Sequence, residues 1–224
     1  MDIYLVNLDR RPDRLKSFFT HSNFPPEWEN KIIREPAVDG IKLPEARLKP
    51  GEIGCFMSHV KLWQRVCDNE RPALVLEDDT IFSANFLHRF QETVLPALPE
   101  IVSEGAVLYV GGRDSPEFVT KRRFTEPWLG EQLVRFLRPF ETGGGAVLAG
   151  NSYVDRTTHA YLITPTAAKG LLAAFHRLGP AVGWTTPVDK FLRQTHLISP
   201  SSVLLTCCPL LCYSPLSDDS DCQL

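Results

Sequence analysis

The stretch Ala73-Leu74-Val75-Leu76-Glu77-Asp78-Asp79 joins a short apolar run directly to three acidic residues. A continuous apolar run of this length is typical of a strand buried in a parallel sheet. Carboxylates packed at its end repel one another unless a cation or hydrogen-bond donors offset their charge. Because ligands of open α/β sheets bind outside the carboxyl ends of the strands, this junction predicts a site for a hard divalent cation carrying a phosphorylated ligand.

Strand and helix patterns alternate along the rest of the chain. Strands are expected at 3–6, 32–38, 73–76, 106–110, 158–163 and 203–205, and helices at 12–20, 52–68, 83–95, 165–176 and 185–195. Apolar residues recur at helical spacing in the longest of these helices. Residues 113–155 have a weak pattern and are interpreted as loops and short strands. The alternation predicts a three-layer, Rossmann-like α/β sandwich with a mostly parallel mixed sheet.

Length and composition bound the class of protein. The chain has 224 residues, of which 43% are hydrophobic and 23% charged, as expected for one globular domain over residues 1–224 with a polar tail, 217–224, that can fray. A net charge of −3 gives no general attraction to nucleic acid or to an anionic membrane. We find no signal peptide and no apolar run of the ~20 residues that a membrane-spanning helix needs, and a cytoplasmic location is expected.

The six cysteines lack the density of a secreted disulfide scaffold. Cys207, Cys208 and Cys212 lie in an apolar run without a Cys-x-x-Cys or histidine partner, so core packing is favoured over a zinc site. Lys121-Arg122-Arg123 allows peripheral contact with a membrane that carries a lipid acceptor, although an exposed basic loop is the more ordinary interpretation.

Polar residues also follow other expected strands. Asn7 and Arg10 come after the first strand, and Arg10 and Arg14 are four residues apart, so on a helical turn both guanidinium groups could face one phosphate. Gly111-Gly112 ends the strand at 106–110 and could line a sugar pocket without side-chain bulk. Asp189 begins a helix and could act as a general base.

Each of these signals also has an ordinary structural interpretation. The acidic triplet could be a solvated helix cap, the arginines a solvated first turn, and Asp189 a plain acid at a helix N-terminus. Ser58 and His59 border the apolar face of the helix at 52–68, where a lone histidine is usually a satisfied, half-buried residue.

Together the motifs resemble glycosyltransferase family 25, which includes bacterial lipooligosaccharide galactosyltransferases and the collagen galactosyltransferases. The matching segments are Asn7-Leu8-Asp9-Arg10 with Arg14, Pro36-Ala37-Val38-Asp39-Gly40, Gly51-Glu52-Ile53-Gly54-Cys55 with Ser58-His59, Leu76-Glu77-Asp78-Asp79, Thr158-His159-Ala160-Tyr161-Leu162-Ile163 and Pro187-Val188-Asp189. Any one motif is common, whereas six in this order are specific. Residues 113–155 match poorly, and acceptor specificity is expected there.

The resemblance implies a GT-A-like fold, a UDP-sugar donor such as UDP-galactose, a Mn²⁺ or Mg²⁺ ion, and inversion at the anomeric carbon. It also implies a glycan, glycolipid or protein acceptor and a role in glycan or lipopolysaccharide biosynthesis. The candidate metal ligands are Glu77, Asp78 and Asp79, and the candidate general base is Asp189. The candidate donor-binding residues are Asn7, Arg10, Arg14, Ser58, His59, Asp78, Gly111, Gly112 and His159.

Two other functions use the same acidic rim. A metal-dependent nucleotidyl- or phosphoryl-transfer enzyme would need a phosphate-cradling glycine-lysine loop or more acidic residues, and neither is evident. A non-catalytic protein could bind a nucleotide sugar or glycan without transferring it, although the retained acidic triplet argues against a decayed enzyme.

Overall fold

The computed structural model describes residues 1–44, 47–113, 135–139, 146–149, 157–193, 203–208 and 211–214. The described strands are β1 (Asp2–Asn7), β2 (Ile32–Pro36), β3 (Ala73–Glu77), β4 (Ile81–Phe82), β5 (Ala106–Tyr109), β6 (Gly111–Arg113), β7 (Arg135–Pro139), β8 (Ala146–Ala149), β9 (Ala160–Ile163), β10 (Val203–Cys208) and β11 (Cys212–Ser214). The α-helices are α1 (Pro12–His21), α2 (Pro50–Asn69), α3 (Phe86–Arg89), α4 (Leu95–Ser103), α6 (Pro165–Leu178) and α7 (Val188–Arg193). The shorter helical segments are η1 (Pro26–Lys31), η2 (Gly40–Lys42), the π-helical η3 (Phe90–Val94) and η5 (Pro180–Trp184).

The main sheet has eight strands in the order β2-β1-β3-β9-β5-β10-β8-β7. β1 pairs with β2 and β3 in parallel, and β5 pairs with β10 in parallel. Only β9 and β8 run against the other strands of this sheet, because each pairs antiparallel with both of its neighbours. The expected mostly parallel, mixed sheet is therefore confirmed.

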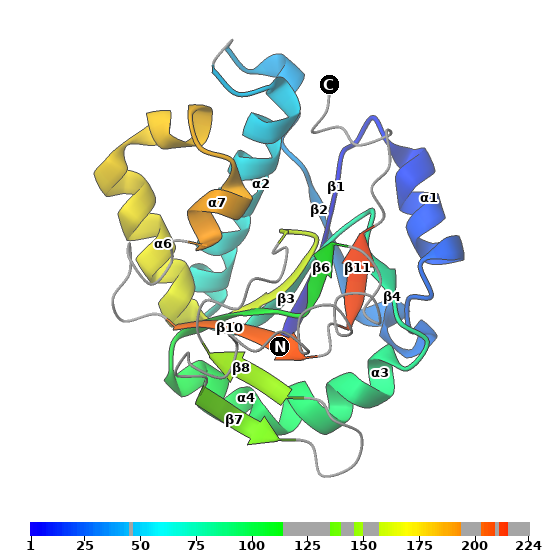
Figure 1. Ribbon diagram of the computed structural model, residues 1–224. Coiled ribbons are helices and arrows are strands. Elements are labelled where there is room, and N and C mark those ends of the chain that lie inside the picture. The colour runs from blue at the N-terminus through cyan, green and yellow to red at the C-terminus, as the bar shows by residue number, and fades with distance from the viewer. Residues whose placement is uncertain are drawn as a thin grey trace.

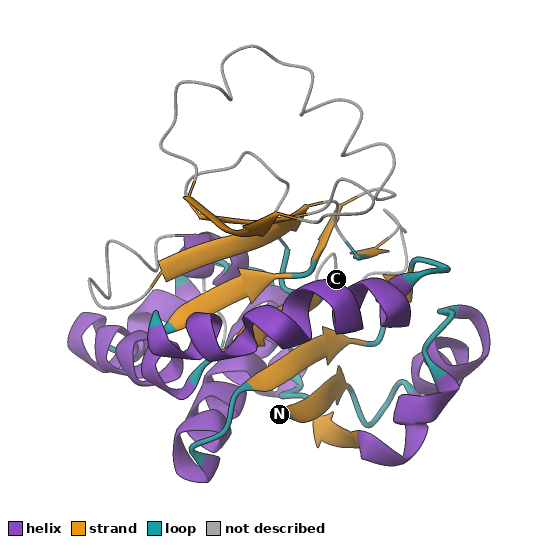
Figure 2. Cartoon of the chain, turned by 90° about the horizontal axis from the view of Figure 1, so that it is seen from below, coloured by secondary structure: helices purple, strands orange, loops and turns teal. Residues whose placement is uncertain are grey.

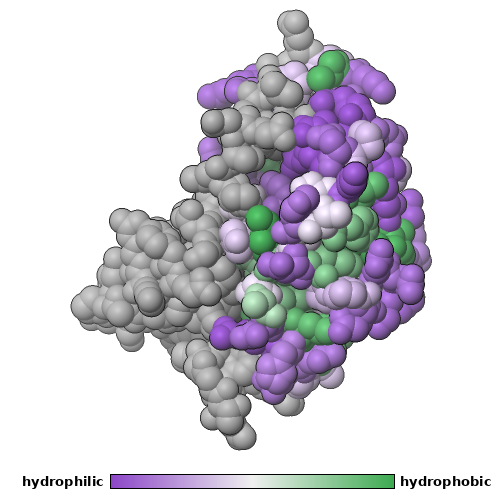
Figure 3. Space-filling view, turned by 90° about the vertical axis from the view of Figure 1, so that its right-hand side faces the viewer, coloured by the Kyte–Doolittle hydropathy of each residue, from purple (hydrophilic) through white to green (hydrophobic). Residues whose placement is uncertain are grey.

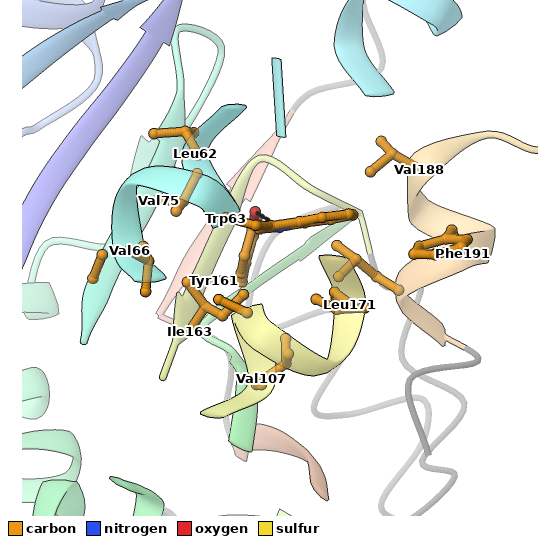
Figure 4. Packing of buried hydrophobic residues seen from close by; sticks show 14 of the residues in the cluster. Leu62, Trp63, Val66, Val75, Val107, Tyr161, Ile163, Leu171, Val188 and Phe191 are labelled. Carbon is orange, nitrogen blue, oxygen red and sulfur yellow. Dashed lines mark hydrogen bonds between the residues drawn. The ribbon is translucent and has the colours of Figure 1, made fainter. Parts of the chain in front are cut away.

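Helices cover both faces of this sheet, as Figures 1 and 2 show. On one face, α1 and the stretch from α3 to α4 pack with apolar residues such as Phe18, Phe86 and Phe90, which we call the α4-side core. On the other face, α2, α6 and α7 pack in what we call the α2-side core, which includes Trp63 and Tyr161 (Figure 4). The chain thus has the expected three-layer α/β architecture.

The central strands bury both faces because their side chains alternate between the two cores. In β3, Leu74 and Leu76 belong to the α4-side core, whereas Ala73 and Val75 belong to the α2-side core. This explains why the run before the acidic triplet is continuously apolar. β1 lies beside β3 with Val6 opposite Glu77, so the two strands end at the same rim of the sheet.

Two local expectations are corrected. Ser83 does not begin a helix: its N–H donates to the carbonyl of Leu211, its carbonyl accepts from the N–H of Phe86 in a turn, and the helical stretch runs from Phe86 to Ser103. Gly111 and Gly112 do not simply end a strand. They form β6, which pairs with β11 in a second sheet ordered β4-β11-β6.

Some expectations fall outside the described residues. These are the basic segment 121–123, the tail 217–224, most of 113–155 and the end of the helix expected at 185–195. Cys212 is buried in the α4-side core, in line with the packing role expected for it. No helix in the described part of the chain is long and apolar enough to cross a membrane. On the side that carries α1, the described surface is largely hydrophilic, with smaller hydrophobic areas between (Figure 3).

Candidate functional site

Residues Glu77 to Thr80 form a tight turn at the end of β3, which we call the acid turn. The N–H of Thr80 donates to the carbonyl of Glu77 at 3.1 Å. The carbonyl of His159, just before β9, accepts from the N–H of Glu77 at 2.8 Å and from the hydroxyl of Thr80 at 2.5 Å. The start of β9 therefore fixes the backbone that presents the three carboxylates.

Asp78 is held by two neighbours from the first part of the chain. Its Oδ2 accepts from Nδ2 of Asn7 at 2.7 Å, and its Oδ1 lies 2.6 Å from the guanidinium of Arg14. Burial nevertheless raises the pKa of Asp78 to about 6, because the loss of solvent outweighs the favourable contacts with Arg14 and Asn7. Arg14 and Asn7 therefore do not fully offset the cost of burying the ionised form of Asp78.

Asp79 has an oxygen that no described residue satisfies. Its Oδ2 accepts from the hydroxyl of Ser214 at 3.0 Å and lies 3.6 Å from Arg14. Its Oδ1 is buried without a hydrogen-bond partner in the described structure. Burial, followed by repulsion from Glu77, raises the pKa of Asp79. A buried, unpartnered carboxylate oxygen beside a second carboxylate is what a hard divalent cation would relieve, so Asp78 and Asp79 fit the implied metal.

Glu77 differs from its two neighbours. Burial opposes its ionisation, but the hydrogen bond and charge of His59, together with smaller contributions from Thr158 and His159, lower the pKa of Glu77. His59 is fully buried, with Nε2 3.2 Å from Glu77 Oε1 and Nδ1 2.8 Å from the Tyr161 hydroxyl. Nε1 of Trp63 donates to the same hydroxyl at 3.2 Å. His59 therefore acts on the site through Glu77.

The two expected arginines reach one pocket but have different partners. Arg14 contacts Asp78 and Asp79, whereas Arg10 lies before α1 and pairs with Asp39 Oδ2 at 3.4 Å. Both line a pocket of about 170 Å³. The pocket extends from the acid turn to η2 and the start of α2, and its lining residues are Val6, Asn7, Leu8, Arg10, Arg14, Ala37, Val38, Asp39, Gly40, Ile41, Pro50, Gly51, Cys55, Ser58, Glu77, Asp78 and Asp79.

Ser58 shapes the η2 end of this pocket. Its hydroxyl donates to the carbonyl of Gly54 at 2.7 Å and accepts from the N–H of Val38 at 2.8 Å. Gly40 also requires its small size, since a Cβ there would lie 1.6 Å from the carbonyl oxygen of Pro50. The absence of a side chain at Gly40 and the two hydrogen bonds of Ser58 thus let η2 pack closely on α2.

Four expected donor contacts do not line this pocket: His59, which lies behind Glu77, and His159, Gly111 and Gly112. His159 is buried and contacts the hydroxyl of Thr157. Gly111 packs on it, because a Cβ at Gly111 would lie 2.9 Å from Nε2 of His159. Gly112 pairs with Tyr213 in the second sheet. His159 supports the acid turn through its carbonyl, and contact of any of these residues with a sugar stays a prediction.

Asp189 lies in the first turn of α7, whose Val188 and Phe191 pack in the α2-side core. It does not line the pocket around the acid turn. Its role as a general base therefore stays a prediction.

Several residues at the site carried no clear signal in the sequence. Arg34 donates to Oδ1 of Asn7 at 3.1 Å, which completes the side-chain contacts of that amide. Asp39 lies in a matched motif but was not expected as a site residue. Ser214 reaches Asp79 from 135 positions further along the chain, a distance that no local pattern bridges.

Known proteins similar to this chain point to one family. The profile of glycosyltransferase family 25 (LPS biosynthesis protein) matches residues 27–192. A glycosyltransferase 25 family member from Aedes aegypti is 33% identical over 191 residues, covering 76% of this chain and 27% of the relative. Procollagen galactosyltransferase 2 of Mus musculus is 31% identical over 134 residues, covering 49% and 20%. Inactive glycosyltransferase 25 family member 3 of Mus musculus is 28% identical over 217 residues, covering 85% and 31%.

The chain spans less than a third of the length of each of these relatives. The profile match, in contrast, extends over most of this chain and includes η2, α2, the acid turn and α7. The chain belongs to glycosyltransferase family 25.

Proposed function

We propose that this protein transfers a sugar, galactose in the first instance, from a UDP-sugar to an acceptor hydroxyl with inversion at the anomeric carbon. The observation that carries the proposal is the pair Asp78 and Asp79, with an unsatisfied buried oxygen, at one end of an open pocket. Family membership supports glycosyl transfer. The name of the mouse relative, procollagen galactosyltransferase 2, supports galactose as the first donor sugar to test.

The two ends of the pocket suit the two ends of a nucleotide sugar. At the η2 end, Ile41 is 61% exposed and Pro50 lies nearby, so both offer apolar surface to a nucleobase. At the other end, the acid turn and Arg14 provide the charges that a diphosphate and its counter-ion need. Asn7 keeps Asp78 oriented through their 2.7 Å hydrogen bond.

Asp78 and Asp79 are the residues that would hold Mn²⁺ or Mg²⁺. When bound, the ion supplies Lewis-acid stabilisation of the charge on the leaving diphosphate. Arg14 would add charge-assisted hydrogen bonds to the same group. Glu77, which is already engaged by His59, stays a candidate third ligand.

Inversion requires the acceptor hydroxyl to attack from the face opposite the diphosphate. A carboxylate near that face must take the hydroxyl proton, a step typically worth about 10²–10⁴-fold in rate. Asp189 is the candidate for this base. Its replacement in Asp189→Asn is expected to lower turnover more than donor affinity, whereas a variant with weaker donor binding and unchanged turnover would make Asp189 a ligand contact instead.

The proposal is tested by thermal unfolding with UDP-galactose, UDP-glucose, UDP and nucleoside triphosphates, each with and without Mn²⁺. A donor present at about 100 times its Kd stabilises the folded state by about 2.7 kcal/mol, which raises Tm by roughly 5–10 °C for a chain of this size. UDP-galactose with Mn²⁺ is expected to give the largest shift, and release of UDP in the presence of acceptors gives turnover.

The variant Asp79→Asn tests the metal site without disturbing the fold. It is expected to keep the fold, lose the Mn²⁺-dependent shift and lose turnover. Asp13→Asn is the matched control, since Asp13 is exposed, pairs with Arg11 and does not line the pocket. Normal turnover in Asp79→Asn would rule out the assigned role. Consumption of nucleoside triphosphates would favour nucleotidyl transfer, and donor binding without any hydrolysis or transfer would favour a non-catalytic binder.

A further inference from the structure

A second group of possible metal ligands lies beside the acid turn. A thiol, an imidazole and a carboxylate, from Cys55, His59 and Glu77, have ligand atoms that all lie within 4.8 Å of one another. Cys55 and His59 are four residues apart on α2, so their side chains share one face of the helix. Glu77 comes from the end of β3 and faces them across the layer between helix and sheet.

We propose that Cys55, His59 and Glu77 form a binding site for Zn²⁺, separate in chemistry from the carboxylate pair Asp78 and Asp79. Thiolate and imidazole ligands select zinc and similar borderline-soft ions, whereas Mn²⁺ and Mg²⁺ prefer oxygen ligands. The site of Cys55, His59 and Glu77 is therefore expected to prefer Zn²⁺, and the pair Asp78 and Asp79 is expected to prefer Mn²⁺ or Mg²⁺. Three protein ligands with one open position is an arrangement that zinc commonly takes outside purely structural sites.

The imidazole is already oriented for this role. Nε2 of His59 lies 3.2 Å from Glu77 Oε1, and Nδ1 contacts the hydroxyl of Tyr161 at 2.8 Å. That hydroxyl is in turn fixed by Nε1 of Trp63, in the part of the α2-side core drawn in Figure 4. A second hydrogen bond that holds the ring is a regular feature of histidines that bind metals.

The remaining ligands can adjust to the ion. Zinc bonds of about 2.0–2.3 Å in a tetrahedral site place ligand atoms roughly 3.3–3.8 Å apart, so a shift on the order of 1 Å closes the group around an ion. Cys55 is half-buried and the side chain of Glu77 is 21% exposed, whereas His59 is fully buried and held by its neighbours. The two side chains that must move are thus the two with room to do so.

An ion can reach the site from the pocket. Cys55 and Glu77 both line it, whereas His59 is fully buried behind them, so the open coordination position falls on the pocket side. Binding releases the thiol proton of Cys55, and any proton on Nε2 of His59, to water.

Zinc at this site is also expected to affect the acid turn. This second expectation, unlike zinc binding itself, rests on the proposed function. It draws the Glu77 carboxylate toward α2 and places a second dication next to Asp78 and Asp79. Zn²⁺ is therefore expected to antagonise Mn²⁺-dependent turnover. Zinc binding itself does not depend on turnover, so the failure of one proposal can be distinguished from the failure of the other.

Cobalt(II), which takes zinc sites and absorbs light, provides the direct test on the whole chain. Bound to a thiolate, it gives a sulfur-to-metal charge-transfer band in the near ultraviolet. We expect this band at one equivalent of Co²⁺ in the unmodified protein, its displacement by Zn²⁺, and its loss in Cys55→Ser. Cys67→Ser is the matched control, since Cys67 is also half-buried on α2 but lies about 18 Å further along the helix axis.

A second measurement needs no variant. Zn²⁺ is expected to slow the alkylation of Cys55, measured by mass spectrometry of its peptide, and to leave the rate at Cys67 unchanged. A missing charge-transfer band in the unmodified protein, an equal band in a folded Cys55→Ser protein, or equal alkylation of Cys55 with and without Zn²⁺ would each overturn the proposal.

Discussion

The two hydrophobic cores, one on each face of the sheet, differ in what they contain. The α4-side core contains a continuous series of aromatic rings, formed by Phe18, Phe82, Phe86 and Phe90. The ring centroids of Phe82 and Phe86 are 4.7 Å apart. The α2-side core instead holds a chain of polar contacts that ends at Glu77. The first core holds α1, the helix that carries Arg14, whereas the second fixes Glu77 directly through hydrogen bonds.

This difference has a physical basis. Apolar contacts in the α4-side core are non-directional: they hold α1, and with it Arg14, against the sheet without fixing the orientation of a single side chain. The hydrogen bond from Trp63 to Tyr161 and the one between Tyr161 and His59 are directional, and burial makes each one costly to leave unmade. The chain of buried hydrogen bonds that reaches the candidate site thus lies on the α2 side of the sheet.

The largest loss of stability is expected in the α4-side core. Phe86→Ala removes a fully buried ring that contacts Trp28, Phe82 and Phe90, and should lower the free energy of unfolding by about 3–5 kcal/mol. Chemical denaturation measures this change. Leu178→Ala, at a 52% exposed position, should stay within about 0.5 kcal/mol. If Phe86→Ala altered Co²⁺ or donor binding in the protein that remains folded, the two cores would not be functionally separate.

A smaller loss, with a second effect, is expected in the α2-side core. Tyr161→Phe keeps the ring but removes the hydroxyl that Trp63 and His59 share, which should cost about 1–3 kcal/mol. Zinc affinity should fall by about 10–100-fold, as when other outer partners of metal ligands are removed.

Tyr4→Phe is the matched control for this change. The Tyr4 hydroxyl is also hydrogen-bonded, to Asn69 at 2.9 Å and to Asp2 at 3.4 Å, whereas the hydrogen bonds of His59 go to Tyr161 and Glu77. A similar loss of stability with unchanged zinc affinity is expected. Equal affinity losses in the two variants, measured by competition with a chromophoric chelator, would contradict a positioning role for Tyr161.

The smallest effect is expected where Ser58 joins α2 to the segment after β2. Ser58→Ala leaves the N–H of Val38 without its hydroxyl acceptor and should cost about 1 kcal/mol. Because Ser58 supports η2, a modest rise in donor Kd is expected with little change in turnover. Ser103→Ala, at an exposed hydroxyl, provides the comparison. A large fall in turnover would show that Ser58 does more than shape the pocket.

Local patterns in the sequence predicted most of the fold. The apolar run at 73–76 became β3, and the helical spacing at 52–68 became most of α2, because both elements bury their faces in the way that their periodicity requires. The helix expected at 83–95 begins at Phe86 instead, and Ser83 pairs through its N–H with Leu211, a residue that no local pattern connects to it. The pairing of Gly111 and Gly112 in β6 also escapes local patterns, since their partner strand β11 lies about a hundred positions later.

The sequence by itself determined that carboxylates leave a buried strand at a rim of the sheet, since that follows from one continuous apolar run and the charges after it. Only the tertiary structure decided how those carboxylates differ. Asp78 meets Asn7 and Arg14, Asp79 keeps an unsatisfied oxygen, and Glu77 turns to His59. These environments come from strands and helices far apart in the chain, and it is their burial, charge and hydrogen bonds, absent from any local pattern, that set the properties of each carboxylate.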